Sequence, residues 1–227
     1  MFQGFTEETT EFLMGITFNN ERSWFLEHKQ DFERFLHGPI KELTSDTLDL
    51  IQKTFPEEDL WPHISRIYRD ARRVYGKGPY QDNMWFTFQR GTTKSIGPVF
   101  WFEITAFSYS YGVGIWEQDA KLMKIFREEI DRDPTSFTQM VQKLDAIGGY
   151  RLYGDMYKKL KGRQGTLLEP WYNRKSFSVG WEFSLDASIY EKDLPQRLLE
   201  VFSNLMPMYR FFRKVYDFAA ETQEEEF

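Results

Sequence analysis

Cysteine is absent from this chain of 227 residues. Its absence excludes disulfides, thiolate nucleophiles and zinc–thiolate sites, and it is typical of the reducing cytoplasm. Long apolar runs are missing as well: the stretch PVFWFEITAF is far shorter than the ~20 residues of a membrane-spanning helix and includes Glu103. The N-terminal stretch MFQGFTEETTEF is acidic, whereas a signal peptide begins with basic residues. We therefore expect a soluble cytoplasmic protein that does not associate with membranes.

Residues typical of catalytic and cofactor-binding motifs are scarce. The three histidines, His28, His37 and His63, are isolated from one another. The tripeptide GKG at 76–78 lacks the spacing of a P-loop, and no G-x-G-x-x-G or G-x-S-x-G motif occurs. The sequence therefore indicates no metal site and names no cofactor, although the acids of EEIDRDP leave a carboxylate-bound Mg²⁺ open.

Aromatic residues, in contrast, make up 18% of the chain, and hydrophobic residues 41%. This composition predicts a folded protein with a sizeable core. Because no linker-like segment or internal repeat is present, we expect a single domain over residues 1–227. The net charge of −6 argues against general nucleic-acid binding, which needs many cations to neutralise phosphates.

The hydrophobic pattern predicts helices near both termini and in the middle of the chain. Thr6 is expected to cap a helix that ends near residues 18–20, and Asn20 to cap the next one. The pair Gly38-Pro39 should break or kink the helical run that follows. Apolar spacing and capping residues predict three further helical regions: 119–131, 134–147 and a C-terminal run from Asp193 that Pro207 interrupts.

Stretches rich in β-branched and aromatic residues lie between these helices and predict strands: HISRIYRD, MWFTFQRG, VFWFEITAF, YSYGVGIW and KSFSVGWEFSL. Short connections favour antiparallel pairing. Gly112 and Gly114 are expected to mark a bulge or a close backbone approach. The predicted fold class is α+β, a mainly antiparallel sheet with N-terminal, middle and C-terminal helices packed on it.

The segment RIYRDARRVYGKGPY concentrates positive charge in an acidic protein. A strand over residues 63–70 would place Arg66 and Tyr68 on one face and Ile67 and Arg69 on the other. Guanidinium groups form paired hydrogen bonds with phosphate or carboxylate, so the segment is a candidate anion site. The candidate ligand-binding residues are Arg66, Arg69, Arg72, Lys77 and Tyr80.

Asp70 is the one candidate catalytic residue in this segment. It would hold an arginine in place, or act as a general base if its pKa were raised. A structural interpretation stands beside this one, because arginine and aspartate close together often tie a loop to the core. Arg69 in particular could pair with an acid on another strand, such as Glu103 or Glu182.

The spacing Arg66-x-x-Arg69-Asp70-x-Arg72, followed by Lys77-x-Pro79-Tyr80, resembles the signature R-x-x-R-D-x-R-F-x-x-x-K-x-P-Y. That signature belongs to domain-of-unknown-function family 2461, a family of bacterial and fungal proteins. The stretches NNERSWFLEHKQDFE, YGVGIW and REEIDRDPTSF extend the resemblance along nearly the whole chain. One position departs from the signature, since Arg73 replaces its phenylalanine. The resemblance implies a fold group and no activity.

Two further segments, LYGDMYKKLKGR and LEPWYNRKSFS, offer charges beside flat aromatic rings that could stack on a base or sugar. Packing and solvated turns would explain the same residues. The candidates for a second shell of the site are Tyr157, Lys158, Trp171, Tyr172, Asn173, Arg174 and Lys175.

These patterns favour binding of an anionic or phosphorylated small molecule, with turnover left open. The alternative is a non-enzymatic interaction module that docks an acidic protein or nucleic acid, with the Arg-Asp motif partly structural. The sequence does not indicate the ligand or the oligomeric state.

Overall fold

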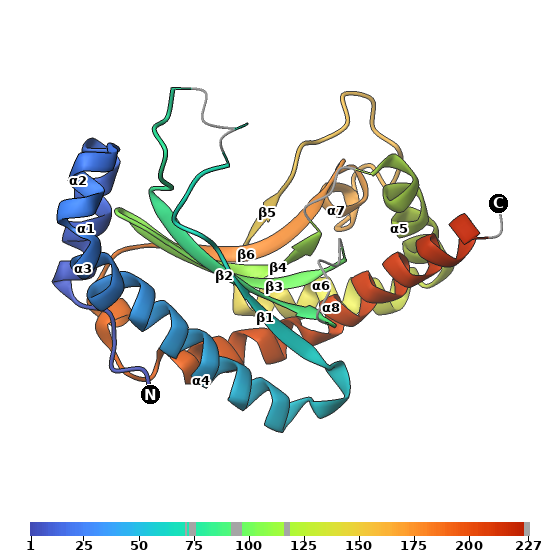
Figure 1. The fold of residues 1–227 in the computed structure, drawn as a ribbon. Coiled ribbons are helices and arrows are strands. Elements are labelled where there is room, and N and C mark those ends of the chain that lie inside the picture. Colours follow the sequence, from blue (N-terminus) through green and yellow to red (C-terminus); the bar gives the residue numbers. More distant parts are fainter. Residues whose placement is uncertain (71, 73–75, 92–96, 116–118, 225–227) are drawn as a thin grey trace. The chain divides into compact units, whose positions relative to one another are not determined.

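The computed structural model describes residues 1–70, 72, 76–91, 97–115 and 119–224. They form an α+β fold around a six-stranded sheet of order β1-β2-β3-β4-β6-β5, which confirms the predicted fold class (Figure 1). The pairs β1–β2 and β5–β6 are antiparallel. The strands are β1 (Leu60–Ile64), β2 (Asn83–Arg90), β3 (Val99–Thr105), β4 (Ser108–Ile115), β5 (Arg151–Tyr153) and β6 (Phe177–Ser184).

Helices precede, interrupt and follow these strands. The α-helices are α1 (Glu7–Phe18), α2 (Arg22–Glu27), α3 (Lys29–Asp31), α4 (Gly38–Thr54), α5 (Ala120–Arg132), α6 (Pro134–Ile147), α7 (Glu169–Tyr172) and α8 (Leu194–Glu224). A π-helical segment, Phe32–His37, joins α3 to α4, and short 3₁₀ turns lie at Pro56–Glu58 and Ala187–Tyr190. Within the described residues, no helix combines the length and the apolar character that a membrane crossing requires.

The chain divides into two compact units. Unit 1 consists of Met1–Gly91, Trp101–Tyr111 and Glu182–Glu200, and unit 2 of Thr92–Phe100, Gly112–Trp181 and Val201–Phe227. The single domain expected over residues 1–227 stays a prediction.

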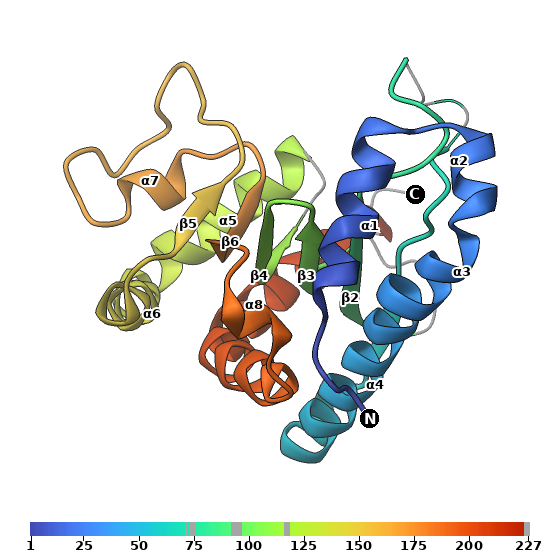
Figure 2. The same ribbon diagram turned by 90° about the vertical axis from the view of Figure 1, so that its left-hand side faces the viewer.

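The core of unit 1 is aromatic. Alternation along β2 buries Phe86 and Phe88, since side chains two residues apart share a face. Phe86 stacks on Phe102 of β3 at 5.3 Å between ring centroids, and Phe102 stacks on Phe5 at 6.3 Å. Helix α4 packs against β1 and β2, as Figures 1 and 2 both show.

The helical run of unit 1 passes through Gly38-Pro39, where a break or kink was predicted. Proline lacks a backbone N–H, so the carbonyl of Phe35, four residues earlier, loses its helical partner. The hydroxyl of Thr9 donates to that carbonyl at 2.6 Å. The preceding turn is π-helical, and the N–H of Gly38 reaches back to the carbonyl of Glu33. A wider turn and a side-chain partner together keep the run helical.

The core of unit 2 forms where helices pack on β6. Phe126 of α5 stacks on Phe177 of β6 at 5.6 Å, and Phe137 of α6 meets Trp171 edge-on at 5.6 Å. Helices α5 and α6 have the predicted positions: Asp119 caps α5 by accepting hydrogen bonds from two backbone N–H groups.

Two local predictions were wrong, and two short elements were missed. Pro207 does not interrupt α8, because it is exposed while Leu205 and Tyr209 on either side are fully buried, and that packing offsets the lost hydrogen bond. The strand expected at 63–70 ends at Ile64. The short elements β5 and α7 were not predicted. The close approach expected at the glycines of β4 is confirmed, since a Cβ on Gly114 would lie 2.5 Å from Cβ of Ser178.

Candidate functional site

The motif segment continues from β1 without regular strand pairing. Tyr68 and Tyr80 form an isolated antiparallel bridge. The N–H of Arg69 donates to the carbonyl of Pro79 at 2.8 Å, and the N–H of Gln81 donates to the carbonyl of Ile67 at 2.7 Å. These bonds hold the two ends of the segment together. The predicted alternation is confirmed: residues 66, 68 and 70 are exposed, whereas Ile67 is buried and Arg69 half-buried.

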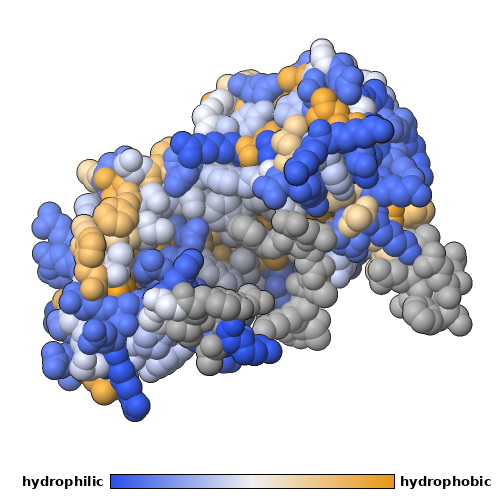
Figure 3. All heavy atoms as spheres, turned by 90° about the horizontal axis from the view of Figure 1, so that it is seen from above, coloured by the Kyte–Doolittle hydropathy of each residue, from blue (hydrophilic) through white to orange (hydrophobic). Residues whose placement is uncertain are grey.

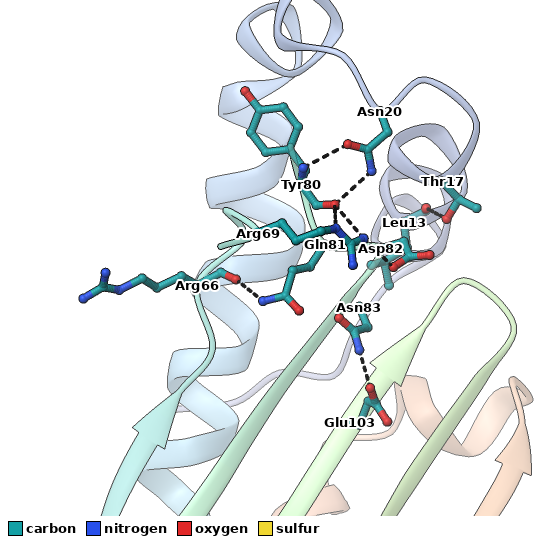
Figure 4. Close-up of polar contacts among 10 residues, drawn as sticks. All are labelled: Leu13, Thr17, Asn20, Arg66, Arg69, Tyr80, Gln81, Asp82, Asn83 and Glu103. Carbon is teal, nitrogen blue, oxygen red and sulfur yellow. Dashed lines mark hydrogen bonds and ion pairs between the residues drawn. The ribbon is translucent and has the colours of Figure 1, made fainter. Parts of the chain in front are cut away.

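Asn20 fastens the far end of this segment to the N-terminal helices. Its side-chain Oδ1 accepts the N–H of Tyr80 at 2.9 Å, and its Nδ2 donates to the carbonyl of Tyr80 at 3.0 Å (Figure 4). Asn20 was predicted to cap α2, but Glu21 stands at that position. The side chain therefore fixes a distant backbone instead of its own helix.

Gly78 makes this approach possible. Its φ of +77° lies in the left-handed region that glycine adopts at least cost. A Cβ at this position would lie 2.4 Å from Oδ1 of Asn20. The GKGPY part of the motif is therefore shaped by the contact with Asn20.

Arg69 belongs to the same contact. Its Nε and Nη2 donate to the carbonyl of Tyr80 at 3.2 and 2.9 Å, and Nη2 also donates to Oδ1 of Asp82 at 3.3 Å (Figure 4). Its side chain is only 18% exposed. The Nε and Nη2 groups of Arg69 are thus used in hydrogen bonds within the protein. Only Nη1 would be available to donate to a ligand. The acidic partner of Arg69 is therefore Asp82, and not Glu103 or Glu182, the two acids given as examples from the sequence.

The ring of Tyr80 lies in the core. It is 3% exposed and stacks on Phe25 at 4.3 Å. Burial raises the pKa of its hydroxyl. This packing accounts for tyrosine in the motif, and contact of Tyr80 with a ligand stays a prediction.

Asp70 and Arg72 form an exposed pair. Oδ1 of Asp70 accepts the backbone N–H of Arg72 at 3.0 Å and its Nε at 3.1 Å, while Oδ2 accepts Nη2 at 2.8 Å. The side chain of Arg72 is 89% exposed. The hydrogen bonds to Asp70 raise the pKa of Arg72, so it stays charged. Asp70 therefore holds an arginine in place, and its role as a general base stays a prediction.

Arg66 and Lys77 are exposed cations at the two ends of the motif. The backbone carbonyl of Arg66 accepts Nε2 of Gln81 at 2.8 Å, while its side chain extends away from the protein (Figure 4). Neither side chain forms an ion pair with any residue that the structure describes. Arg73, where the chain departs from the family signature, lies outside the described residues.

A half-buried acid lies beside the start of β2. Nδ2 of Asn83 donates to Oε1 of Glu103 on β3 in a short hydrogen bond (Figure 4). Burial raises the pKa of Glu103, the bond from Asn83 lowers it, and the charges of Glu182 and Asp82 raise it further. Glu103 therefore keeps its proton to a higher pH than an exposed glutamate does, and it lies in the same unit as the motif segment.

The second set of predicted residues belongs to unit 2, and three of them are buried. Trp171 is 1% exposed and stacks on Phe177 at 4.9 Å, so its faces are occupied by the core. The hydroxyl of Tyr172 donates to Oδ2 of Asp131 at 2.6 Å. Asn173 is fully buried, and its amide bonds four backbone groups of the preceding loop. These residues hold the loop between β5 and β6 in place.

The remaining four lie nearer the surface. Lys158 is exposed, and Tyr157, Arg174 and Lys175 are half-buried. The N–H of Lys175 donates to the carbonyl of Asp155 at 2.8 Å. Arg174 donates to the carbonyl of Gly154. Of the second set, Arg174 and Lys175 thus combine partial burial with a formal charge.

Asn20, Asp82 and Asn83 belong to these networks, although they had not been predicted as parts of a site. Only Asn20 carried a signal, as part of the NN segment that the family resemblance includes. Among the described residues, no group of three or more histidines and acids is arranged to hold a metal ion.

The protein has an α+β fold, and hydrogen bonds attach its arginine-rich motif segment to the N-terminal helical region. Over residues 8–211 the chain matches the family described as "Conserved hypothetical protein (DUF2461)", and it belongs to that family. The resemblance drawn from the motif is thereby confirmed. A comparison with curated proteins finds no match.

Proposed function

We propose that the motif segment binds an anionic small molecule, most simply one that carries a phosphate group, in a cytoplasmic protein. The observation that supports this proposal best is the pair of exposed cations Arg66 and Lys77, for which the described part of the chain supplies no acidic partner. Arg72 extends the same charge, since Asp70 fixes its guanidinium while most of it stays exposed.

The surroundings of these cations favour a binding role. Asn20, Arg69 and the Tyr68–Tyr80 bridge hold the segment, so its exposed charges do not have to support the fold. A site held in place before the ligand arrives loses less entropy on binding. Exposed charge alone is weak support, because hydrophilic residues cover much of the surface seen in Figure 3. Arg66 and Lys77 differ from ordinary surface charges because no described acid pairs with either of them.

Turnover would need a group that moves a proton. Asp70 is engaged by Arg72, whereas Glu103 is a half-buried acid with a raised pKa. Of the two, Glu103 has the environment usual for a general acid, which needs a pKa shifted towards the working pH.

Titration calorimetry with ATP at low ionic strength tests the proposal. We expect heat of binding for the unaltered protein and its loss in the Arg66→Met/Lys77→Met double variant. Lys53→Met, which removes an exposed charge from α4 of the same unit, serves as the control and should bind as the unaltered protein does. Absence of binding at low salt would contradict the proposal. Binding of an acidic protein or nucleic acid with steep salt dependence, and none of ATP, would instead favour the interaction module.

A further inference from the structure

The strands β5 and β6 of unit 2 continue past their regular pairing through a bulge. Tyr153 pairs with Ser178, and Met156 pairs with Arg174 in an isolated bridge. Two residues lie between Tyr153 and Met156, but three lie between Arg174 and Ser178. The segment between Arg174 and Ser178 therefore bulges. Gly154 allows the close approach, with a φ of +102° and a Cβ position 2.2 Å from the carbonyl oxygen of Ser176.

Arg174 lies at this bulge with an incomplete set of partners. Its Nη1 donates to the carbonyl of Gly154, but its Nε is buried and finds no hydrogen-bond partner among the residues that the structure describes. No acid of the described chain lies within ion-pair distance of its guanidinium. Burial alone lowers the pKa of Arg174, and no nearby carboxylate opposes the shift.

A desolvated cation without a counter-charge is costly, and proteins normally pair such groups. Tyr172 and Asn173, beside Arg174 in the chain, have complete sets of hydrogen bonds. Within unit 2, Nη1 of Arg127 and Oγ of Ser178 are also buried without a hydrogen-bond partner among the described residues. A position like that of Arg174 is expected where a ligand supplies the missing negative charge.

The segment around Arg174 also carries a surplus of positive charge. Residues 151–175 contain seven basic and two acidic side chains, a surplus of five positive charges in a chain whose net charge is −6. One of the acids, Glu169, accepts the N–H of Gly165. Lys161 and Arg127 both lie over the ring of Tyr157, at 4.8 and 5.4 Å from its centroid. In Figure 2 most of this segment forms the long loop between β5 and α7.

We propose that Arg174 anchors a second anion-binding site, in unit 2, which takes a phosphate group. The accessible part of its guanidinium would donate to the phosphate oxygens, and the basic loop would supply the surrounding potential. A doubly charged phosphate gains more from that potential than a carboxylate does, so phosphate is the favoured ligand. This site is independent of the one formed by Arg66 and Lys77.

Thermal unfolding with and without inorganic phosphate, at constant ionic strength, tests the proposal. We expect phosphate to raise the Tm of the unaltered protein, and acetate to raise it less. The Arg174→Met variant keeps the length of the side chain and removes its charge. Without phosphate its Tm should equal or exceed that of the unaltered protein, because an uncompensated cation has been removed. With phosphate, the rise should be lost or clearly reduced.

Two further variants separate the possible outcomes. Lys143→Met removes an exposed charge from α6 of the same unit and should keep the full rise. In the Arg66→Met/Lys77→Met double variant, phosphate should still produce the part of the rise in Tm that depends on Arg174. A rise that Arg174→Met leaves intact would overturn the proposal, as would the absence of any rise. A large fall in the Tm of Arg174→Met without phosphate would also overturn it, because Arg174 would then be a structural residue.

Discussion

The side-chain amide of Asn20 forms two hydrogen bonds with the backbone of Tyr80, although 60 residues separate the two in sequence. One bond satisfies the N–H of Tyr80 and the other its carbonyl, which is how a neighbouring strand would bond this residue. Arg69 donates to the same carbonyl. An asparagine of the N-terminal segment and an arginine of the basic motif thus act together on one peptide group.

The amide of Asn20 should contribute measurably to stability. Replacing it in Asn20→Ala removes both bonds and leaves the N–H of Tyr80 without its partner, which costs about 1–3 kcal/mol. For a chain of this size the Tm should fall by about 2–12 °C, as measured by differential scanning calorimetry. Asn19→Ala is the matched control, because the side chain of Asn19 bonds only the carbonyl of Gly15 in the adjacent helix, and it should have a smaller effect.

Alanine substitutions at two glycines of the motif distinguish the free-energy cost of a left-handed backbone from the cost of a steric clash. Gly76 and Gly78 share a φ of +77°, but a Cβ on Gly76 would have nothing within 4 Å, whereas one on Gly78 would meet Asn20. Gly76→Ala should cost about 1–2 kcal/mol, the usual penalty for a left-handed alanine. Gly78→Ala should lower the Tm further. Equal losses in urea unfolding would show that the contact between Gly78 and Asn20 is unimportant.

Arg72 should matter little for stability. Its pair with Asp70 is exposed to water, and ion pairs of that kind contribute little to folding. We expect Arg72→Ala to unfold within a few degrees of the unaltered protein in a buffer without phosphate or sulfate. A fall as large as that of Asn20→Ala would show that the pair holds the fold together, and the proposed anion site would lose one of its members.

Glu103 should make stability depend on pH. Because burial raises its pKa in the folded state, folded protein holds this proton to a higher pH than unfolded protein does. Its contribution therefore falls as pH rises from the ordinary glutamate pKa through the raised value. Gln cannot ionise, so Glu103→Gln should match the unaltered protein below this window and have the higher Tm above it.

The exposed neighbour provides the comparison for that experiment. Glu182→Gln should narrow the pH window of Glu103 from its upper end, because the charge of Glu182 is one of the causes that raise the pKa of Glu103. A constant difference in Tm between Glu103→Gln and the unaltered protein at all pH values would mean that Glu103 titrates normally.

Much of the fold could be predicted from local sequence. Asp119 and Pro134 carry the capping chemistry that begins α5 and α6, and the alternation of phenylalanines in β2 reports its buried face. The prediction that Pro207 interrupts the C-terminal helix was wrong for a physical reason. The local propensity of proline favours a break, but the buried residues on either side of it keep α8 continuous. Tertiary packing is not visible in a local window.

The candidate site shows the same limit. The motif could be recognised as unusual, and the alternation placed Arg66 and Arg69 on opposite faces, without indicating which face is buried. Its division into structural and exposed residues could not be predicted, because it depends on Asn20, whose side chain also suits a helix cap. Asn83 and Glu103 meet across two strands, and the pairing of β2 with β3 is not encoded in either one alone.

The most direct test of this account compares Arg66→Met with Arg69→Met, each with and without pyrophosphate at low ionic strength. Arg66→Met should unfold at the Tm of the unaltered protein and lose most of the rise that pyrophosphate produces. Arg69→Met should lose about 1.5–3 kcal/mol of stability, because it removes hydrogen bonds from a charged donor. It should still respond to pyrophosphate under conditions where it is folded. A stable Arg69→Met variant, or an Arg66→Met variant with an undiminished pyrophosphate response, would contradict the division of roles between these two arginines.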